Sequence, residues 1–385
     1  MHETETSPRW VVPMRPRSPD EPHRSATPLE LLFDLVFVVA VAQAATGLHH
    51  GIAEGHITET IIHYLMVFFG VLWLWMGFSW FASSYDNDDI PYRLLVFVQI
   101  TGALIAASGV ERIFTNEDLT VTVLGYVIMR IGYLIQWLRV ARSDATHRTT
   151  ALRYGLGAAG CQIIWVILLF LPKETHLPGF VILVIVELMI PVWGERAGVT
   201  TFHEHHIRER YGLFTLIVLG ETILSTSMAF QTGTDESGLS ASFLLLAIGG
   251  LLIVYSMWWL YFYRHTPLRM DSLRSTFLWS YGHFGVFSAT AAVGAGLAIA
   301  VDMIAHHSEI SQTTANLALT IPTAIYVLSL WILQEHSRDK NVINTLLHPI
   351  AAILILLTSF TEQTVILTGI LLVILVAVRF IRHLE

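Results

Sequence analysis

The chain has 385 residues, of which 54% are hydrophobic and only 14% are charged, and its formal net charge is −8. Soluble globular proteins average about 25% charged residues, whereas the apolar residues here come in blocks of about 20, the length of a helix that crosses a bilayer. Composition therefore excludes a soluble enzyme, a nucleic-acid-binding protein and a secreted disulfide-linked protein. It predicts an all-α fold, a polytopic integral membrane helix bundle.

The first 26 residues precede any apolar span. They are rich in Pro, Arg and Ser, so we expect residues 1–26 to form a disordered cytoplasmic tail without a signal peptide. Cys161 is the single cysteine and lies inside an apolar run, which excludes an intrachain disulfide.

About twelve predicted membrane spans follow the tail, separated by short clusters of turn-forming and charged residues. Six of them fall in a first transmembrane half, residues 27–196, and six in a second half, residues 197–385. The spans lie near residues 28–48, 58–82, 92–110, 119–140, 150–171, 177–193, 206–229, 239–262, 274–300, 313–333, 342–358 and 363–382.

The basic residues predict the orientation of these spans. With a cytoplasmic N-terminus and twelve crossings, nineteen Lys and Arg residues lie on the cytoplasmic side, and only Arg112 and Lys173 lie on the opposite side. Membrane proteins concentrate basic residues in their cytoplasmic loops. We therefore expect both termini to be cytoplasmic.

The two predicted halves share a pattern. The first span of each half carries acidic residues ahead of an apolar run, and the second span of each half ends in an aromatic patch. Two parallel six-helix repeats are therefore one arrangement that the sequence allows. The patches contain Trp73, Trp75, Trp80, Trp258 and Trp259, which we interpret as interfacial belt residues at the cytoplasmic ends of their spans.

Ionisable residues inside the spans are the candidate functional residues, because a charge at membrane depth costs at least about 2.5–3.5 kcal/mol on insertion scales. Three acids, Asp34, Glu187 and Glu221, accompany one central arginine, Arg130. If each of these acids paired with an arginine or a neighbouring helix end, its role would be to stabilise helix packing. Three acids around one arginine instead predict carboxylates that carry protons or bind a cation. Glu30 lies one turn before Asp34, where an acid also complements the helix dipole.

The seventh span opens with the sequence HEHHIRERYG, which contains His206, Glu209 and Arg210, and it reaches Glu221 eleven residues after Arg210. One interpretation is a polar stripe that leads from the cytoplasm to a deep carboxylate. The other is a set of interfacial side chains at the start of a helix. His283, inside the ninth span, is a further candidate.

Eighteen histidines could suggest a metal site, and His205 and Glu209 have the spacing to share a zinc ion. However, no H-E-x-x-H pattern occurs, and adjacent histidines point to different helix faces. The sequence also contains no P-loop and no G-x-S-x-G elbow. We therefore expect no metal and no cofactor, and we find no support for ATP-driven transport or serine hydrolysis.

Two longer motifs are similar to those of a known family. The stretch ELLFDLVFV at residues 30–38 resembles the opening signature of the bacterial low-temperature-requirement protein A family. The stretch HIRERYGLF at residues 206–214, continuing to Leu219-Gly220-Glu221, is similar to its second signature. The resemblance implies a multi-helix protein of the bacterial inner membrane that is connected with growth in the cold. By this resemblance the functional positions are Glu30, Asp34, Arg93, Arg130, Glu209, Arg210, Glu221 and His283.

Three functions remain open at this stage. The first is a secondary transporter or channel coupled to protons or cations, in which Asp34 and Glu221 bind the proton or ion, Arg130 is the counter-charge and His283 relays protons. The second is a membrane sensor or assembly partner without turnover. The third is a membrane-embedded lipid-modifying enzyme that uses one of these acids or histidines as a general base. The expected partners are membrane lipids, a proton, cation or small solute, and no nucleic acid; an oligomer is compatible with all three functions.

Overall fold

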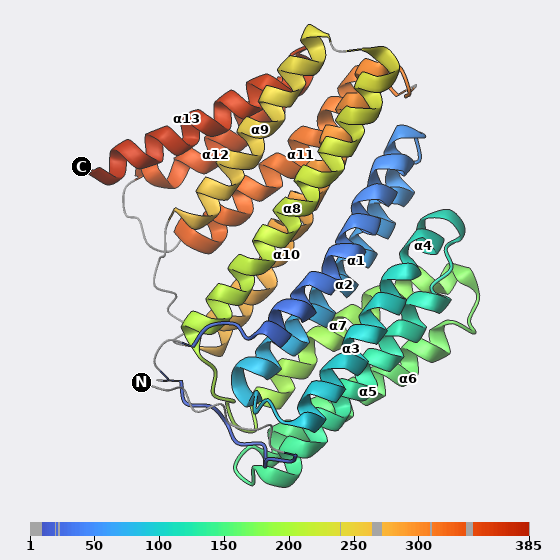
Figure 1. Cartoon of the computed structure of the whole chain (residues 1–385), viewed down its shortest axis with the longest axis vertical. Coiled ribbons are helices and arrows are strands. Elements are labelled where there is room, and N and C mark those ends of the chain that lie inside the picture. Colours follow the sequence, from blue (N-terminus) through green and yellow to red (C-terminus); the bar gives the residue numbers. More distant parts are fainter. Residues whose placement is uncertain are drawn as a thin grey trace. The chain divides into compact units, whose positions relative to one another are not determined.

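The computed structural model describes residues 10–19, 21, 24–238, 240–263, 272–308, 310–335 and 342–384 (Figure 1). Every element of regular structure in these ranges is a helix, and eleven helices are long and apolar enough to cross a membrane. The predicted all-α membrane bundle is therefore confirmed.

Contacts divide the chain into two compact units. Unit 1 comprises residues 1–40 and 70–213, and unit 2 comprises residues 41–69 and 214–385. Three long helices contribute residues to both units: α1 (Pro28–Ala53), α2 (Ile57–Tyr85) and α8 (Glu204–Ser237).

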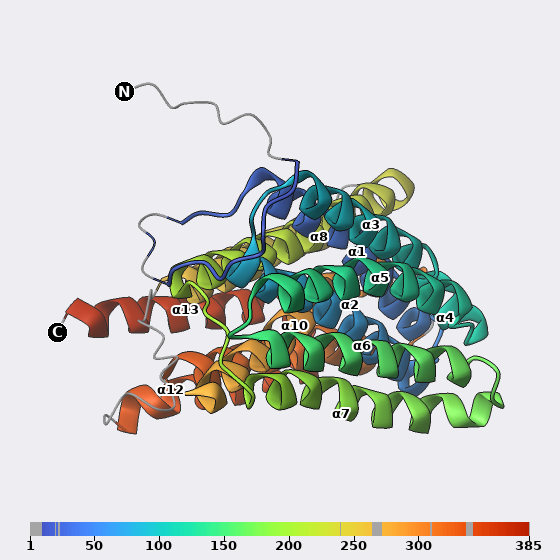
Figure 2. The ribbon, with the colours of Figure 1, turned by 90° about the horizontal axis from the view of Figure 1, so that it is seen from below.

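Unit 1 is completed by a row of antiparallel helices in which α3 packs against α5, α5 against α6 and α6 against α7 (Figure 2). Glycine allows the closest of these contacts, because a Cβ at Gly102 of α3 would lie 2.5 Å from the backbone nitrogen of Met129 on α5. The helices are α3 (Ile90–Ser108), α4 (Val110–Asn116), α5 (Thr120–Ser143), α6 (Arg148–Leu168) and α7 (His176–Glu195).

Unit 2 repeats this order of packing, since α10 packs against α11, α11 against α12 and α12 against α13, while α9 packs against α13. Its helices are α9 (Ala241–Phe262), α10 (Leu273–Ala305), α11 (Gln312–Leu330), α12 (Val342–Leu357) and α13 (Thr364–Leu384). The common order agrees with a six-plus-six repeat. The repeat itself, like the division into a tail and two halves, stays a prediction.

The predicted spans correspond to helices of the structure, with ends that move by a few residues. The span expected near 92–110 continues through α4 to Asn116, and the span expected near 274–300 continues to Ala305. The eleventh predicted span, near 342–358, is the exception in length, because α12 has 16 residues with Pro349 inside it and is shorter than the other apolar helices.

Candidate functional site

The site begins at the first turn of α1, where two acids lie on one helix face. Thr27 and Glu30 form reciprocal bonds that start the helix: the Glu30 backbone N–H donates to Thr27 Oγ1 at 3.3 Å, and the Thr27 N–H donates to Glu30 Oε2 at 2.7 Å. Asp34 follows one turn later on the same face. Both carboxylates are only 1% exposed, so they need partners within the protein.

Arg210 of α8 supplies the cation for both acids. Its Nε and Nη2 donate to the two oxygens of Asp34 at 3.1 and 2.5 Å, and its Nη1 lies 3.0 Å from Glu30 Oε1. Asp34 also accepts a hydrogen bond from Trp75 Nε1 at 2.6 Å, and Ser79 Oγ accepts one from Arg210 at 3.2 Å. One guanidinium thus holds two buried carboxylates, and Asp34 is the more completely bonded of the two.

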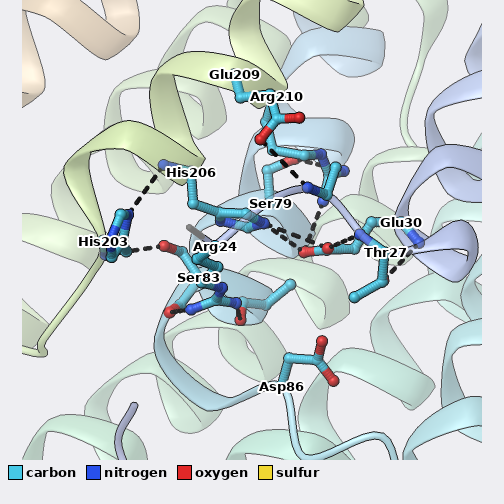
Figure 3. A network of polar contacts seen from close by, with 12 residues as sticks. Arg24, Thr27, Glu30, Ser79, Ser83, Asp86, His203, His206, Glu209 and Arg210 are labelled. Atoms are coloured by element: carbon cyan, nitrogen blue, oxygen red, sulfur yellow. Dashed lines mark hydrogen bonds and ion pairs between the residues drawn. The ribbon is translucent and has the colours of Figure 1, made fainter. Parts of the chain in front are cut away.

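His206 adds a titratable group to this cluster (Figure 3). Its Nε2 lies 3.1 Å from Glu30 Oε1, and the imidazole is fully buried. The backbone N–H of His206 donates to Nδ1 of His203, so His203 caps the start of α8 with a ring nitrogen. Glu30 therefore contacts a permanent cation, Arg210, and a titratable imidazole, His206.

The segment before α1 closes the end of α2 in unit 1. The Arg24 guanidinium donates to the carbonyl oxygen of Ala82 at 2.7 Å and to that of Ser83. The backbone N–H of Arg17 donates to the Ser84 carbonyl at 2.8 Å. These carbonyls belong to the last turn of α2, where partners within the helix run out. We call residues 10–19 and 24–27 the N-terminal strap; all of it except Thr27 lies within residues 1–26, the segment predicted as a disordered tail.

Asp86 follows α2 beneath the strap and is buried (Figure 3). Burial raises the pKa of Asp86 to about 6, and the negative charge of Glu30 contributes to the rise, while Arg17 and Arg24 oppose it. Arg17 Nη1 lies 3.8 Å from the Asp86 carboxylate. Asp86 is therefore a carboxyl group whose protonation changes just below neutral pH.

Glu187 forms a second buried cluster in unit 1, separate from the contacts of Asp34. Its carboxylate accepts hydrogen bonds from Trp73 Nε1 and Tyr126 OH, both at 2.7 Å, from Trp165 Nε1 at 3.3 Å, and from Arg130. Of the three acids that the sequence places around one central arginine, Glu187 is the one that pairs with Arg130 among the described residues, and Asp34 pairs with Arg210 instead. Arg130 pairs with Glu187, and four donors fix this carboxylate as a structural anion.

Glu221 and His283 belong to unit 2. The Glu221 side chain is 5% exposed and accepts a hydrogen bond from Ser225 Oγ at 2.6 Å; among the described residues it forms no ion pair. His283 is buried, with Nδ1 2.8 Å from the Trp279 carbonyl and Nε2 3.2 Å from Tyr261 OH. Glu221 is thus a buried carboxylate with a hydroxyl partner.

The two remaining candidate residues lie outside the buried cluster. Arg93 is 48% exposed and forms a surface ion pair with Asp88 at 2.6 Å. Glu209 is half-buried and accepts the backbone N–H of Ala26 at 3.3 Å, so it fastens the strap to α8.

The aromatic contribution to both clusters was not predicted from the sequence. Trp75 is fully buried and donates to Asp34, so its interpretation as a belt residue is wrong. Trp73 donates to Glu187 and Trp80 donates to Tyr211 OH at 3.2 Å, while both side chains stay partly exposed. A usable signal exists, because an indole N–H inside an apolar span needs an acceptor. No comparable signal marks Ser79 or Arg24.

Metal binding has no support in the part of the chain that the structure describes. In those ranges no three His, Cys, Asp or Glu side chains gather closely enough to hold an ion. His205 is exposed on the surface of α8.

Comparison with known proteins identifies the family. Residues 25–380 match the family described as Bacterial low temperature requirement A protein (LtrA). The chain belongs to this family. Over 278 residues it is also 24% identical to an uncharacterized protein of Rhizobium meliloti (strain 1021), an alignment that covers 67% of this chain and 65% of that protein. No solved structure matches the chain.

The LtrA match confirms the resemblance found in the sequence, and the structure shows where the two stretches that carry it lie. The two signature-like stretches lie about 170 residues apart in the chain, on α1 and α8. They nevertheless meet in unit 1, where Glu30 and Asp34 of the first contact His206 and Arg210 of the second. The LtrA motifs therefore supply the four ionisable side chains of one buried network.

Proposed function

We propose that this LtrA-family membrane protein is a secondary transporter or channel for protons, or for a cation coupled to them, and that Glu30 and His206 bind the proton. The observation that supports this most directly is the 3.1 Å contact between His206 Nε2 and Glu30 Oε1, two buried side chains on helices that are apolar enough to cross a membrane. An imidazole beside a carboxylate can exchange a proton without large movement.

Arg210 and Asp34 have a different role in this proposal. Arginine stays protonated in proteins, and Asp34 is held by both Arg210 and Trp75, so this pair is a fixed dipole that positions the cluster. Glu30 Oε2 accepts the Thr27 N–H and shares a 3.3 Å hydrogen bond with His206 Nε2, while Oε1 lies 3.1 Å from His206 Nε2 and 3.0 Å from Arg210 Nη1. A proton therefore moves between His206 Nε2 and the Glu30 carboxylate, rather than to Asp34.

Glu221 is the second binding group that we propose, for a proton or a cation in unit 2. A buried carboxylate without an ion-pair partner among the described residues is costly at membrane depth unless it is protonated or binds a cation. This cost favours a functional role for Glu221, whereas the four donors around Glu187 favour a structural one.

The setting that we propose is the bacterial inner membrane, with both termini cytoplasmic and membrane lipids around the bundle. The nineteen-to-two distribution of basic residues supports this orientation. An oligomer is compatible with the proposal, and neither a metal nor a cofactor is needed for it.

The test is proton flux in reconstituted vesicles that contain a trapped pH-sensitive dye. We expect the parent protein to dissipate an imposed pH gradient and His206→Gln to lose at least about 90% of that flux. His205→Gln is the matched control, because His205 is its exposed neighbour on α8. If neither the parent nor the control moves protons or cations across a broad panel of gradients, the transport proposal is wrong and a sensor or assembly role is favoured.

A further inference from the structure

Three arginines at one end of α6 and α7 have no acidic partner. Arg148 begins α6, Arg153 lies in its second turn, and Arg196 directly follows α7. Among the described residues none of the three forms an ion pair with a carboxylate. Arg93, by contrast, is also exposed but pairs with Asp88 at 2.6 Å. The three guanidinium groups are therefore available to an anion from outside unit 1.

The acids nearest to these arginines in the chain are bonded inside the protein. Glu195 is buried, and its carboxylate accepts hydrogen bonds from Tyr154 OH and from the Thr200 N–H, both at 2.8 Å. Asp144, before α6, is also buried and lies 2.7 Å from His147 Nδ1. Both carboxylates are thus committed to other partners, and the arginine side chains keep their free donors.

Two hydrogen bonds bring the three arginines together where α6 begins and α7 ends (Figure 2). Thr150 Oγ1 donates to the Gly198 carbonyl at 2.8 Å, and Arg153 Nη1 donates to the Trp193 carbonyl at 2.8 Å. Arg196 lies between Trp193 and Gly198 in the chain. It is therefore held beside the first two turns of α6, which carry the other two arginines.

Arg153 is held in a position that suits a phosphate group. Its Cζ lies 5.3 Å from the centre of the Trp193 ring, a cation–π contact, and Nη1 is bonded to the Trp193 carbonyl. This bond leaves Nε and Nη2, which together form the fork that binds carboxylates and phosphates through two parallel hydrogen bonds. Because the side chain is already fixed, little freedom is lost when an anion binds.

An apolar surface continues directly from the arginines. Leu156 lies three residues after Arg153 on the same face of α6 and is 64% exposed. Met189, one turn before Trp193 on α7, is 49% exposed. Only 22% of the apolar window of α7 is buried within the protein, the smallest share among the eleven candidate spans. The cationic groups therefore border a surface that faces the acyl chains of lipids.

This combination identifies the chemistry of the occupant. A soluble anion or an acidic protein would meet the arginines but would leave the adjoining apolar surface uncovered. A zwitterionic phospholipid carries a cation beside its phosphate, which the arginines would repel. An anionic phospholipid has both a phosphate without a compensating cation and apolar chains, so it matches both parts of the surface.

We propose that an anionic phospholipid binds to unit 1 at α6 and α7, with its phosphate on Arg153 and Arg196 and its acyl chains along Leu156 and Met189. Arg148 lies beside the phosphate and adds to the positive charge. The site needs only that unit 1 lies in a bilayer, so it stands or falls separately from the proposed transport of protons.

Native mass spectrometry of the full-length protein tests the headgroup contacts, with phosphatidylglycerol and phosphatidylcholine of the same acyl chains as probes. We expect the parent protein to retain phosphatidylglycerol at least about fivefold better than phosphatidylcholine, and Arg153→Gln/Arg196→Gln to lose this preference. Arg93→Gln/Arg112→Gln is the matched control, because it removes the same charge from exposed arginines that pair with acids. Equal retention of the two lipids by the parent, or an undiminished preference in Arg153→Gln/Arg196→Gln, would overturn the proposal.

Photocrosslinking of the parent protein locates the acyl chains without any substitution. The probe is phosphatidylglycerol with a diazirine on one acyl chain, in vesicles of phosphatidylcholine. We expect several-fold more crosslinks in peptides of α6 and α7 than in α3, where Leu94 and Phe97 are also exposed. Even labelling of the three helices would overturn the site. Displacement of the probe by glycerophosphoglycerol, the headgroup without acyl chains, would also overturn it and would favour a soluble phosphate as the ligand.

Discussion

At the scale of single residues, Arg210 decides how the buried charges of unit 1 are arranged. It joins Asp34 and Glu30 with one guanidinium that is fully buried, and no other cation forms an ion pair with these carboxylates among the described residues, apart from His206 when it is protonated. Removing one member of such a set leaves an uncompensated charge in a low-dielectric interior.

Arg210→Gln should therefore lower the free energy of unfolding by about 3–5 kcal/mol. The measurement is denaturant unfolding in detergent. Arg93→Gln is the matched control, because the same change breaks an exposed ion pair with Asp88, for which we expect less than about 1 kcal/mol. Adding Asp34→Asn to Arg210→Gln should recover part of the loss. Equal losses for Arg210→Gln and Arg93→Gln would contradict the assignment.

Asp86 makes stability depend on pH. Folding raises its pKa from 3.8 to about 6, because burial disfavours the ionised carboxyl group. The folded protein therefore holds this proton to higher pH than the unfolded chain, and the contribution of Asp86 to stability falls as pH rises from about 4 to about 6. The full difference is on the order of 3 kcal/mol.

Asp86→Asn should remove this dependence. We expect the variant to unfold at a higher temperature than the parent protein at pH 7 and at a similar temperature at pH 4. Melting curves at both values of pH check the prediction, and a variant that is less stable than the parent at pH 7 would refute it.

At the scale of helices, small residues and caps determine the packing. A Cβ at Gly125 of α5 would lie 2.2 Å from the Ala106 backbone nitrogen of α3, and backbone atoms cannot move aside separately. Gly125→Ala should separate the two helices and lower the melting temperature markedly. Gly160→Ala on α6, where nothing lies within 4 Å of the added Cβ, should leave it unchanged or raise it slightly. Similar melting temperatures for the two variants would show that the α3–α5 contact is not as close as described.

The N-terminal strap acts as the C-terminal cap of α2. Without the Arg24 side chain, the Ala82 and Ser83 carbonyls lose the guanidinium donors. Arg24→Gln should therefore speed amide hydrogen exchange in the last turn of α2, whereas Arg15→Gln, at an exposed strap position, should not. Exchange that is as slow in Arg24→Gln as in the parent protein would contradict the capping role.

At the scale of the whole molecule, the helices were predictable and the pairing of their charges was not. Hydrophobic length alone places the membrane spans within a few residues, because a helix has to cover the thickness of the bilayer. Glu30 and Asp34 could also be assigned to one face of α1. Their partners could not, because about 176 residues separate each acid from the α8 side chain that it meets, and only tertiary packing selects Arg210 over Arg130.

The misassignment of Trp75 has a related cause. Tryptophan at the end of a span is typical both of an interfacial belt and of an indole that donates to a buried acid. Only the position of Asp34 on α1, a different helix, shows that Trp75 is a donor to a buried acid and not a belt residue. The capping of α2 by Arg24 could not be predicted from the sequence either, because the charge and proline content of residues 1–26 is typical of a disordered tail.

Glu221 gives a prediction at this scale, because its role concerns transport rather than local packing. Glu221→Gln should abolish flux in folded protein, since the amide keeps the shape of the carboxyl group and the bond with Ser225 but cannot take up a proton. Glu362→Gln, an exposed acid of unit 2, should keep full flux. If Glu221→Gln instead lowers only the melting temperature and retains flux per folded molecule, Glu221 is structural.

The most direct measurement is the proton flux of the parent protein and of Glu30→Gln in vesicles with an imposed pH gradient, compared with protein-free vesicles. The amide introduced by Glu30→Gln would still accept the Thr27 N–H at the start of α1 but could not exchange a proton with His206. We predict flux above the protein-free level in the parent and none in the folded variant. Equal flux in the two proteins, or none in either, would contradict a proton-binding role for the Glu30–His206 pair.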